Sequence, residues 1–201
     1  MSDLPAPITT DRRQNALQAL SGRLAIDPQR LMSVIKSTVI KPDKTGRQAT
    51  DDEVAAFIIV ANQYQLNPLL REVHAFASNG GIVPVVGVDG WASIVNRHPQ
   101  FDGVEFDFEH DEKGNLVACR CTMHCKDRAH PVQVTEYMAE CRRDTIPWRQ
   151  FPRRMLRHKA FIQAARLAFS LSGIHDEDEA RDIVVNIEGE PGKPKPKKTR
   201  L

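Results

Sequence analysis

Apolar and polar positions along this chain follow two different periods, which predict helices towards both ends and strands between them. The clearest helix signal is a capping box, in which Thr50 and Glu53 precede the apolar run of residues 54–61. Because that run is apolar on every side, we expect the helix to be buried on most of its surface. Further helices are predicted from about Arg12, from Pro28 to about Lys36, from Asp89 to about His98, from Pro152 to about Leu171, and from Asp176 to Val184.

Between these helices the pattern has a period of two, which is typical of strands. Residues 71–77 and 82–88 flank a Ser-Asn-Gly-Gly turn, which predicts a β-hairpin. From residue 101 acids alternate with apolar residues, so we expect a strand with an acidic outer face. Two more strands, at 117–124 and around 132–138, are predicted to complete an antiparallel meander. The acids of the first strand are Glu105, Asp107, Glu109 and Asp111.

These elements predict an α+β protein, in which a β-hairpin and a three-stranded antiparallel meander pack with helices and a long basic helix follows the meander. We expect a flexible N-terminus over residues 1–11 and one core domain over residues 12–186. Residues 187–201 are predicted to form a disordered basic tail, because prolines separate its lysines and it has few apolar residues.

The composition is that of a globular protein, with 41% apolar and 27% charged residues in a chain of 201. The apolar run of residues 54–61 is the longest and falls far below the roughly 20 residues of a membrane helix, and the N-terminus lacks the regions of a secretion signal. We therefore expect no membrane contact and a cytoplasmic location. Cys119 and Cys121 share the parity of apolar neighbours, which indicates buried thiols instead of zinc ligands.

The formal net charge of +2 hides a strong separation of charge. Residues 142–166 contain eight basic residues and one acid, Asp144, so this segment has a net charge of about +7. The acids gather instead at residues 102–112 and 176–182. A basic block of this density favours a polyanion as partner, because each neutralised phosphate releases condensed counterions.

The long basic helix has a narrow polar stripe. At about 100° per residue, Lys159, Gln163, Arg166 and Ser170 fall within about 60° of one another, and most other positions are apolar. A solvated helix face would have a wider polar sector, so we interpret the stripe as one edge of a groove. On this interpretation, changing both Lys159 and Arg166 to Ala removes nucleic-acid binding.

Enzyme motifs are missing from the sequence. The glycine-rich segment at residues 86–91 has neither the P-loop nor the dinucleotide fingerprint, and no spacing singles out a nucleophile and its base. We therefore predict no catalytic residue, no cofactor and no metal site. One enzymatic alternative stays open, a metal-dependent nuclease that uses Asp107, Glu109 and Asp111, although a solvated sheet face paired with Arg120 also explains these acids.

Six segments carry a resemblance to a known family. In chain order they are VANQYQLNP at residues 60–68, GIVPVVGVDGW at 81–91, KDR at 126–128, ECRR at 140–143, PRRMLRHKA at 152–160 and ARLAF at 165–169. Over roughly residues 15–185 the chain resembles the Bet family of phage recombination proteins. These are Red beta-like single-strand annealing proteins of the wider RecT and Rad52-like group, whose core is an antiparallel meander followed by a long helix.

The resemblance implies a protein of phage homologous recombination that binds single-stranded DNA and anneals it to its complement without ATP. The family's DNA-contacting positions on the long helix fall on Arg153, Lys159 and Arg166, and a basic residue after the Asn-Pro turn matches Arg71. The candidate DNA-binding residues are Arg71, Lys126, Arg128, Arg153, Arg154, Arg157, Lys159 and Arg166.

The resemblance also implies partners. Family members form homo-oligomeric rings or helical filaments on single-stranded DNA and annealed duplex, in the cytoplasm of a bacterial host cell. They work with a phage 5′ to 3′ exonuclease and the host single-strand-binding protein, which they engage through a C-terminal helical domain, where this sequence has only residues 189–201. The other alternative is a passive protein that protects single strands without annealing them.

Overall fold

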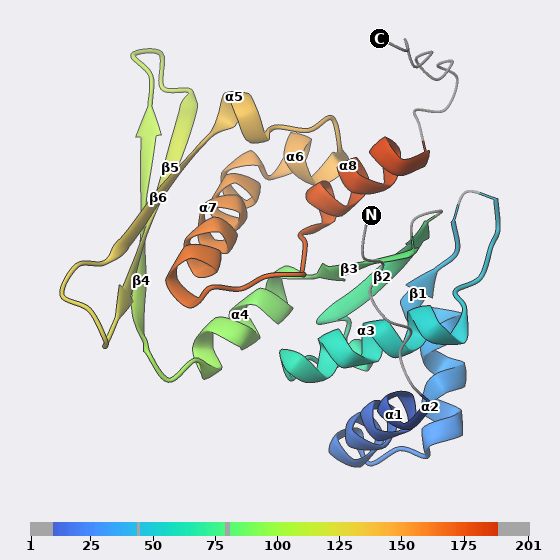
Figure 1. Ribbon diagram of the computed structural model, residues 1–201. Coiled ribbons are helices and arrows are strands. Elements are labelled where there is room, and N and C mark those ends of the chain that lie inside the picture. Colours follow the sequence, from blue (N-terminus) through green and yellow to red (C-terminus); the bar gives the residue numbers. More distant parts are fainter. Residues whose placement is uncertain (1–9, 44, 79–80, 189–201) are drawn as a thin grey trace, which may run out of the picture. The chain divides into compact units, whose positions relative to one another are not determined.

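The computed structural model describes residues 10–43, 45–78 and 81–188 (Figure 1). Helices and two three-stranded sheets make it an α+β protein, which confirms the predicted fold class. The chain divides into two compact units, which we call the hairpin unit (residues 1–90 and 173–201) and the meander unit (residues 91–172). The flexibility predicted for residues 1–11 and the disorder predicted for 187–201 fall almost entirely outside the described residues.

The hairpin unit is built around a small mixed sheet of order β1-β2-β3. The predicted hairpin is present, and β1 adds to it in parallel, with Ile40 opposite Ala75. The elements are α1 (Thr10–Leu24), α2 (Pro28–Val34), the π-helical turn η1 (Ile35–Val39), β1 (Ile40–Lys41), α3 (Asp51–Gln63), the 3₁₀ turn η2 (Pro68–Leu70), β2 (Val73–Ser78), β3 (Gly81–Val86) and α8 (Glu177–Glu188).

The capping box of α3 forms as predicted. The Thr50 hydroxyl accepts a hydrogen bond from the Glu53 backbone N–H at 3.3 Å, and the Glu53 carboxylate accepts one from the Thr50 N–H at 2.8 Å. The helix buries Val54, Ala55, Phe57, Ile58 and Ala61, and within the apolar run only Ile59 is exposed, at 39%. The expectation that the apolar run is mostly buried is therefore confirmed, because α3 packs against both α1 and β3.

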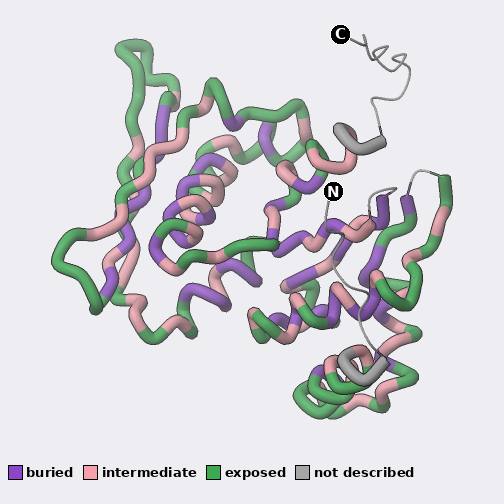
Figure 2. Tube along the Cα trace, viewed as in Figure 1, coloured by how far each residue is buried: buried purple, intermediate pink, exposed green. Residues whose placement is uncertain are grey.

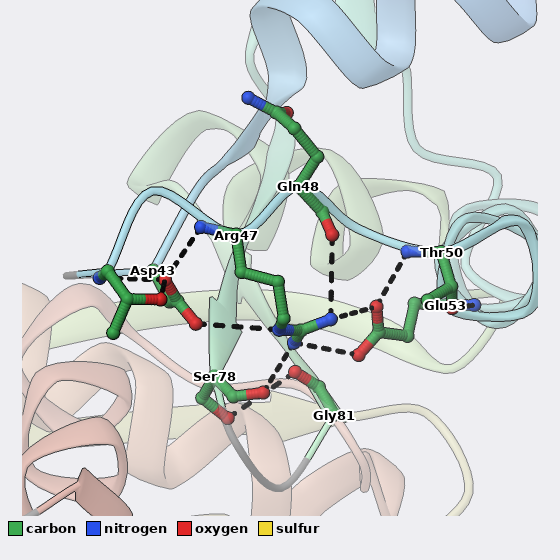
Figure 3. Close-up of polar contacts among 8 residues, drawn as sticks. Asp43, Arg47, Gln48, Thr50, Glu53, Ser78 and Gly81 are labelled. Carbon is green, nitrogen blue, oxygen red and sulfur yellow. Dashed lines mark hydrogen bonds and ion pairs between the residues drawn. The ribbon is translucent and has the colours of Figure 1, made fainter.

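Arg47 connects the segment before α3 to the end of β2 (Figure 3). Its guanidinium donates to both carboxylate oxygens of Glu53, at 2.9 and 3.0 Å, and to the Ser78 carbonyl oxygen at 2.6 Å. Asp43 completes the cluster, since its carboxylate accepts from the backbone N–H of Arg47 at 2.9 Å. These hydrogen bonds fix the segment of residues 45–50 against the end of β2.

The meander unit contains the predicted antiparallel sheet of order β4-β5-β6 and the predicted long helix α7. In the ladder, Cys121 lies opposite Phe106 on one side and Val134 on the other, so these three side chains share a face. Two short helices after the sheet were not predicted. The elements are β4 (Phe101–His110), β5 (Leu116–Cys125), β6 (Val132–Tyr137), α5 (Met138–Cys141), α6 (Ile146–Gln150) and α7 (Pro152–Phe169), with α4 (Val88–Arg97) spanning the boundary of the two units in the sequence.

The acidic strand ends earlier than its pattern suggests. The pairing of β4 with β5 is irregular between Glu109 and His110, and β4 ends there. Asp111, expected on the acidic face, lies instead in the turn, where its carboxylate accepts hydrogen bonds from the backbone N–H groups of Lys113 at 2.9 Å and Asn115 at 2.8 Å.

Candidate nucleic-acid interface

Helix α7 lies across one face of the meander, against β5 and β6 (Figure 1). Buried and exposed stretches alternate along the helix (Figure 2), and small residues allow it to approach the sheet closely. Pro152 begins the helix, and Ser170 ends it in a left-handed conformation. Its buried side chains are Leu156, Ala160, Ile162, Ala164, Ala165 and Ala168.

The cysteines of β5 are part of this packing. Cys119 and Cys121 share the face of the sheet that packs against α7 and are fully buried, and burial raises the pKa of their thiols to about 11 and about 12. Burial and a hydrogen bond to Glu136, 3.0 Å from Sγ to Oε2, likewise raise the pKa of Cys141 to about 12. The prediction of buried thiols is confirmed.

Three exposed arginines project from the first two turns of α7. The guanidinium of Arg153 lies 4.1 Å from the centre of the Phe108 ring, and that of Arg157 lies 5.8 Å from the Phe106 ring. Arg154 lies 4.6 Å from the Phe151 ring. Among the described residues, none of these three arginines has a carboxylate partner. Aromatic contact leaves their positive charge uncompensated, so they attract anions.

The predicted polar stripe is only partly exposed. Lys159, Gln163 and Arg166 are half-buried in the structure. The Arg166 guanidinium lies 5.2 Å from the ring centre of Trp91, which is fully buried. Trp91 is thus a core residue that holds a basic side chain of α7, and it presents no surface for base stacking.

The two basic residues in the segment of residues 126–128 differ in whether an acid compensates their charge. Arg128 forms a bidentate ion pair with Asp127, at 3.0 and 3.2 Å, and donates to the Ala168 carbonyl oxygen at 3.2 Å. This geometry compensates its charge and fixes the last turn of α7. Lys126 is exposed, and its ammonium has no partner among the described residues.

A groove of about 750 Å³ also lies within the meander unit. Its lining residues include three arginines and two acids, with apolar residues between them: Arg142, Arg143, Arg149, Asp111, Asp144, Val117 and Tyr137. Arg149 pairs with Asp144 at 2.8 Å, so its charge is compensated. The +7 segment found in the sequence therefore supplies both the exposed arginines of α7 and part of this groove.

Seven of the eight candidate residues belong to the meander unit, whereas Arg71 belongs to the hairpin unit. The aromatic partners of the arginines, Phe106 and Phe108, were not among the sequence candidates. Their common parity on β4 indicates a shared face, but only the packing of α7 shows that arginines cover them.

The acids of β4 are spread along the outer face of the sheet. Glu109 pairs with Arg120 at 3.1 Å, as the sequence suggested, and Glu105 lies 3.4 Å from His124. Within the described residues, no three His, Cys, Asp or Glu side chains converge on a point where a metal ion could bind. The described helices also include none that is both long and apolar enough to span a membrane.

The meander unit consists of an antiparallel meander followed by a long basic helix, which is the core expected from the resemblance to the RecT and Rad52-like group. Comparison with family models matches the RecT family over residues 28–191, and the chain belongs to the RecT family. It is 48% identical over 189 residues to "Recombination protein bet" of Escherichia phage lambda, a match that covers 85% of this chain and 68% of that relative. The resemblance stated from the sequence is thereby confirmed.

Proposed function

We propose that this protein binds single-stranded DNA and anneals complementary strands in homologous recombination without ATP. One observation carries the proposal: Arg153, Arg154 and Arg157 are exposed on one helix of a RecT-family chain and have no acid partner in the described part of it. Positive groups of this kind bind phosphates, which every DNA sequence offers equally.

Binding through phosphates suits annealing because it leaves the bases free to pair. Phe106 and Phe108 lie beneath arginines and are only partly exposed, so they offer little surface for stacking. Phe151, beside Arg154, is the one exposed ring among the three that these arginines contact. Correct pairing would then be selected by the stability of the duplex itself. No step of this mechanism uses nucleotide hydrolysis or a metal ion.

We further propose that several copies act along one strand, as a ring or a helical filament that holds single-stranded DNA and then the annealed duplex. A phage exonuclease and the host single-strand-binding protein are the proposed partners, because the family resemblance described above implies them. Both proposals rest on family membership, and electron microscopy of protein bound to long single strands would test the assembly.

An annealing assay in gels tests the function. Complementary labelled oligonucleotides are mixed with the protein in EDTA and without ATP, and the products are separated after deproteinisation. We expect intact duplex to form faster than without protein. The double variant Arg153→Gln/Arg157→Gln should lose most of this acceleration, whereas Arg120→Gln should keep it, because Arg120 lies on the outer face of the same sheet and is paired with Glu109.

Two results would reject the proposal. Strands that stay bound but anneal no faster would indicate a passive protecting protein. Shortened strands in a parallel reaction with Mg²⁺ or Mn²⁺ would indicate a nuclease that uses the acidic strand. If the arginine variant anneals as fast as the parent protein, the function stands but the site on α7 is wrong.

A further inference from the structure

The hairpin unit contains a basic pocket of its own. A cavity of about 490 Å³ is lined by Lys41 of β1, Arg71 after η2 and His74 of β2. Glu177, at the start of α8, is the one carboxylate among its lining residues. The remaining lining residues are Thr38 and the apolar residues Val34, Val39, Pro68 and Leu69, which belong to α2, η1 and η2.

The register of the sheet explains why these side chains meet. Lys41 lies opposite Phe76 in the parallel ladder, and His74 precedes Phe76 by two residues, so the three share one face. The Lys41 ammonium lies 5.0 Å from the centre of the Phe76 ring, and the His74 ring packs edge-on against it at 5.6 Å. The Phe76 ring thus holds both basic groups beside the cavity.

Arg71 reaches the same cavity from a constrained turn. Its backbone is left-handed, with φ 59° and ψ 23°, which is uncommon for a residue other than glycine. The turn is held by backbone hydrogen bonds from Arg71 N–H to the Pro68 carbonyl at 3.1 Å and from Glu72 N–H to the Asn67 carbonyl at 3.2 Å. Strain of this kind persists where the surrounding structure fixes it and often marks binding sites.

The pocket has an excess of positive charge. In the described part of the chain, neither Lys41 nor Arg71 has a carboxylate partner, and Glu177 is already paired with Arg181 at 2.7 Å. Burial lowers the pKa of His74, and the nearby charges of Lys41 and Arg71 lower it further, while Glu177 acts in the opposite direction. These are the charged groups that act on His74 from β1, from the turn after η2 and from α8.

We propose that this pocket binds a phosphate group, and that His74 takes up a proton when phosphate is bound, so that binding strengthens as the pH falls. An ammonium, a guanidinium fork and an imidazole offer donors to several oxygens of one compact anion. The negative charge of the anion would oppose the burial and the repulsion that lower the pKa of His74, so proton uptake and anion binding would strengthen each other. The phosphate is either a free ion or part of a DNA backbone, and the second source rests on the proposed function.

Titration of His74 by NMR tests the proposal. The imidazole Cε1–H resonance is assigned by its loss in His74→Asn and is followed against pH in chloride, with inorganic phosphate, and with oligothymidylate, which does not itself titrate near neutrality. With a ligand that binds the pocket, we expect the pKa of His74 to rise by about one unit. The affinity for the ligand should correspondingly rise about tenfold as the pH falls from above the pKa of His74 with ligand to below its pKa without ligand. Lys41→Gln and Arg71→Gln should abolish the shift, whereas Arg30→Gln, an exposed arginine of the same unit outside the pocket, should keep it.

The results with the two ligands distinguish a free phosphate ion from a phosphate of the DNA backbone. A rise with both ligands, or with oligothymidylate alone, supports a pocket for the DNA backbone, and a rise with phosphate alone supports a free-ion site. If neither ligand shifts His74, the inference is wrong, even if the protein anneals DNA normally. If phosphate shifts His74 but single strands do not bind at all, the pocket stands and the proposed function fails.

Discussion

Replacing Arg153 and Arg157 together by Gln should weaken single-strand binding by an amount that depends on salt. Each of the two guanidinium groups is exposed and lies over a phenylalanine ring without an acid partner among the described residues, so each is free to neutralise one phosphate. For single strands, each such contact contributes about −0.7 to the slope of log K against log salt concentration. The double variant should therefore lose about 1.4 from the slope. Between about 50 and about 200 mM salt, the ratio of the parent protein's binding constant to that of the variant should therefore fall about sevenfold.

Fluorescence anisotropy of a labelled oligothymidylate, measured across this salt range, gives both slopes. Arg120→Gln is the matched control, because its charge is already compensated by Glu109, and its slope should equal that of the parent protein. Each lost aromatic contact is expected to cost only about 0.5–1 kcal/mol of stability, so thermal unfolding should show that the variant is folded. An unchanged slope in the folded double variant would refute the assignment of these arginines to phosphate contacts.

Three other predictions concern the fold. Gly90→Ala should lower the free energy of unfolding by ~1–3 kcal/mol in denaturant titrations, because the new Cβ would lie 2.2 Å from the Glu72 carbonyl oxygen. Gly22→Ala is the control, because its new Cβ would have nothing within 4 Å, and it should raise the free energy of unfolding by up to ~1 kcal/mol. The four buried cysteines should resist iodoacetamide at pH 8 in the folded protein and react after unfolding, as mass spectrometry can show, since burial raises their pKa values. Hydrogen bonds from Arg47 hold the pKa of Glu53 below its ordinary 4.5, so this contribution to stability is complete above pH 4.5 and disappears as the pH falls through the lower folded-state pKa. Glu53→Gln should flatten the loss of stability on acidification by up to about 1 kcal/mol, and an unchanged acid limb would contradict this role.

The elements that could be predicted from the sequence are those set by local chemistry. The capping box at Thr50 and the alternation along β4 depend on residues close in the chain, and both were found. Strand β1 could not be predicted, because two residues after a π-helical turn carry no periodicity and pair only through contact with β2. Asp111 was misplaced because an acid that closes a turn has the same parity as the strand before it.

The candidate site was predictable in charge but not in contacts. The basic block of residues 142–166 is visible in the sequence, and three of its α7 arginines, Arg153, Arg154 and Arg157, are exposed, whereas Arg166 is half-buried. What the sequence does not reveal is which charges are compensated, because the pairing of Arg128 with Asp127 and its bond to the end of α7 depend on folding. The stacking of Arg153 on Phe108 similarly requires α7 to lie against the sheet.

The rate of annealing without ATP is the most direct test of the proposed function. Two complementary oligonucleotides carrying a donor and an acceptor dye are mixed by stopped flow in EDTA, with and without the protein, and energy transfer is followed. We predict a large increase in the initial rate for complementary strands, none for non-complementary strands, and a loss of most of the increase in Arg153→Gln/Arg157→Gln. A rate equal to that of the strands alone, at protein concentrations that saturate single-strand binding, would contradict the account.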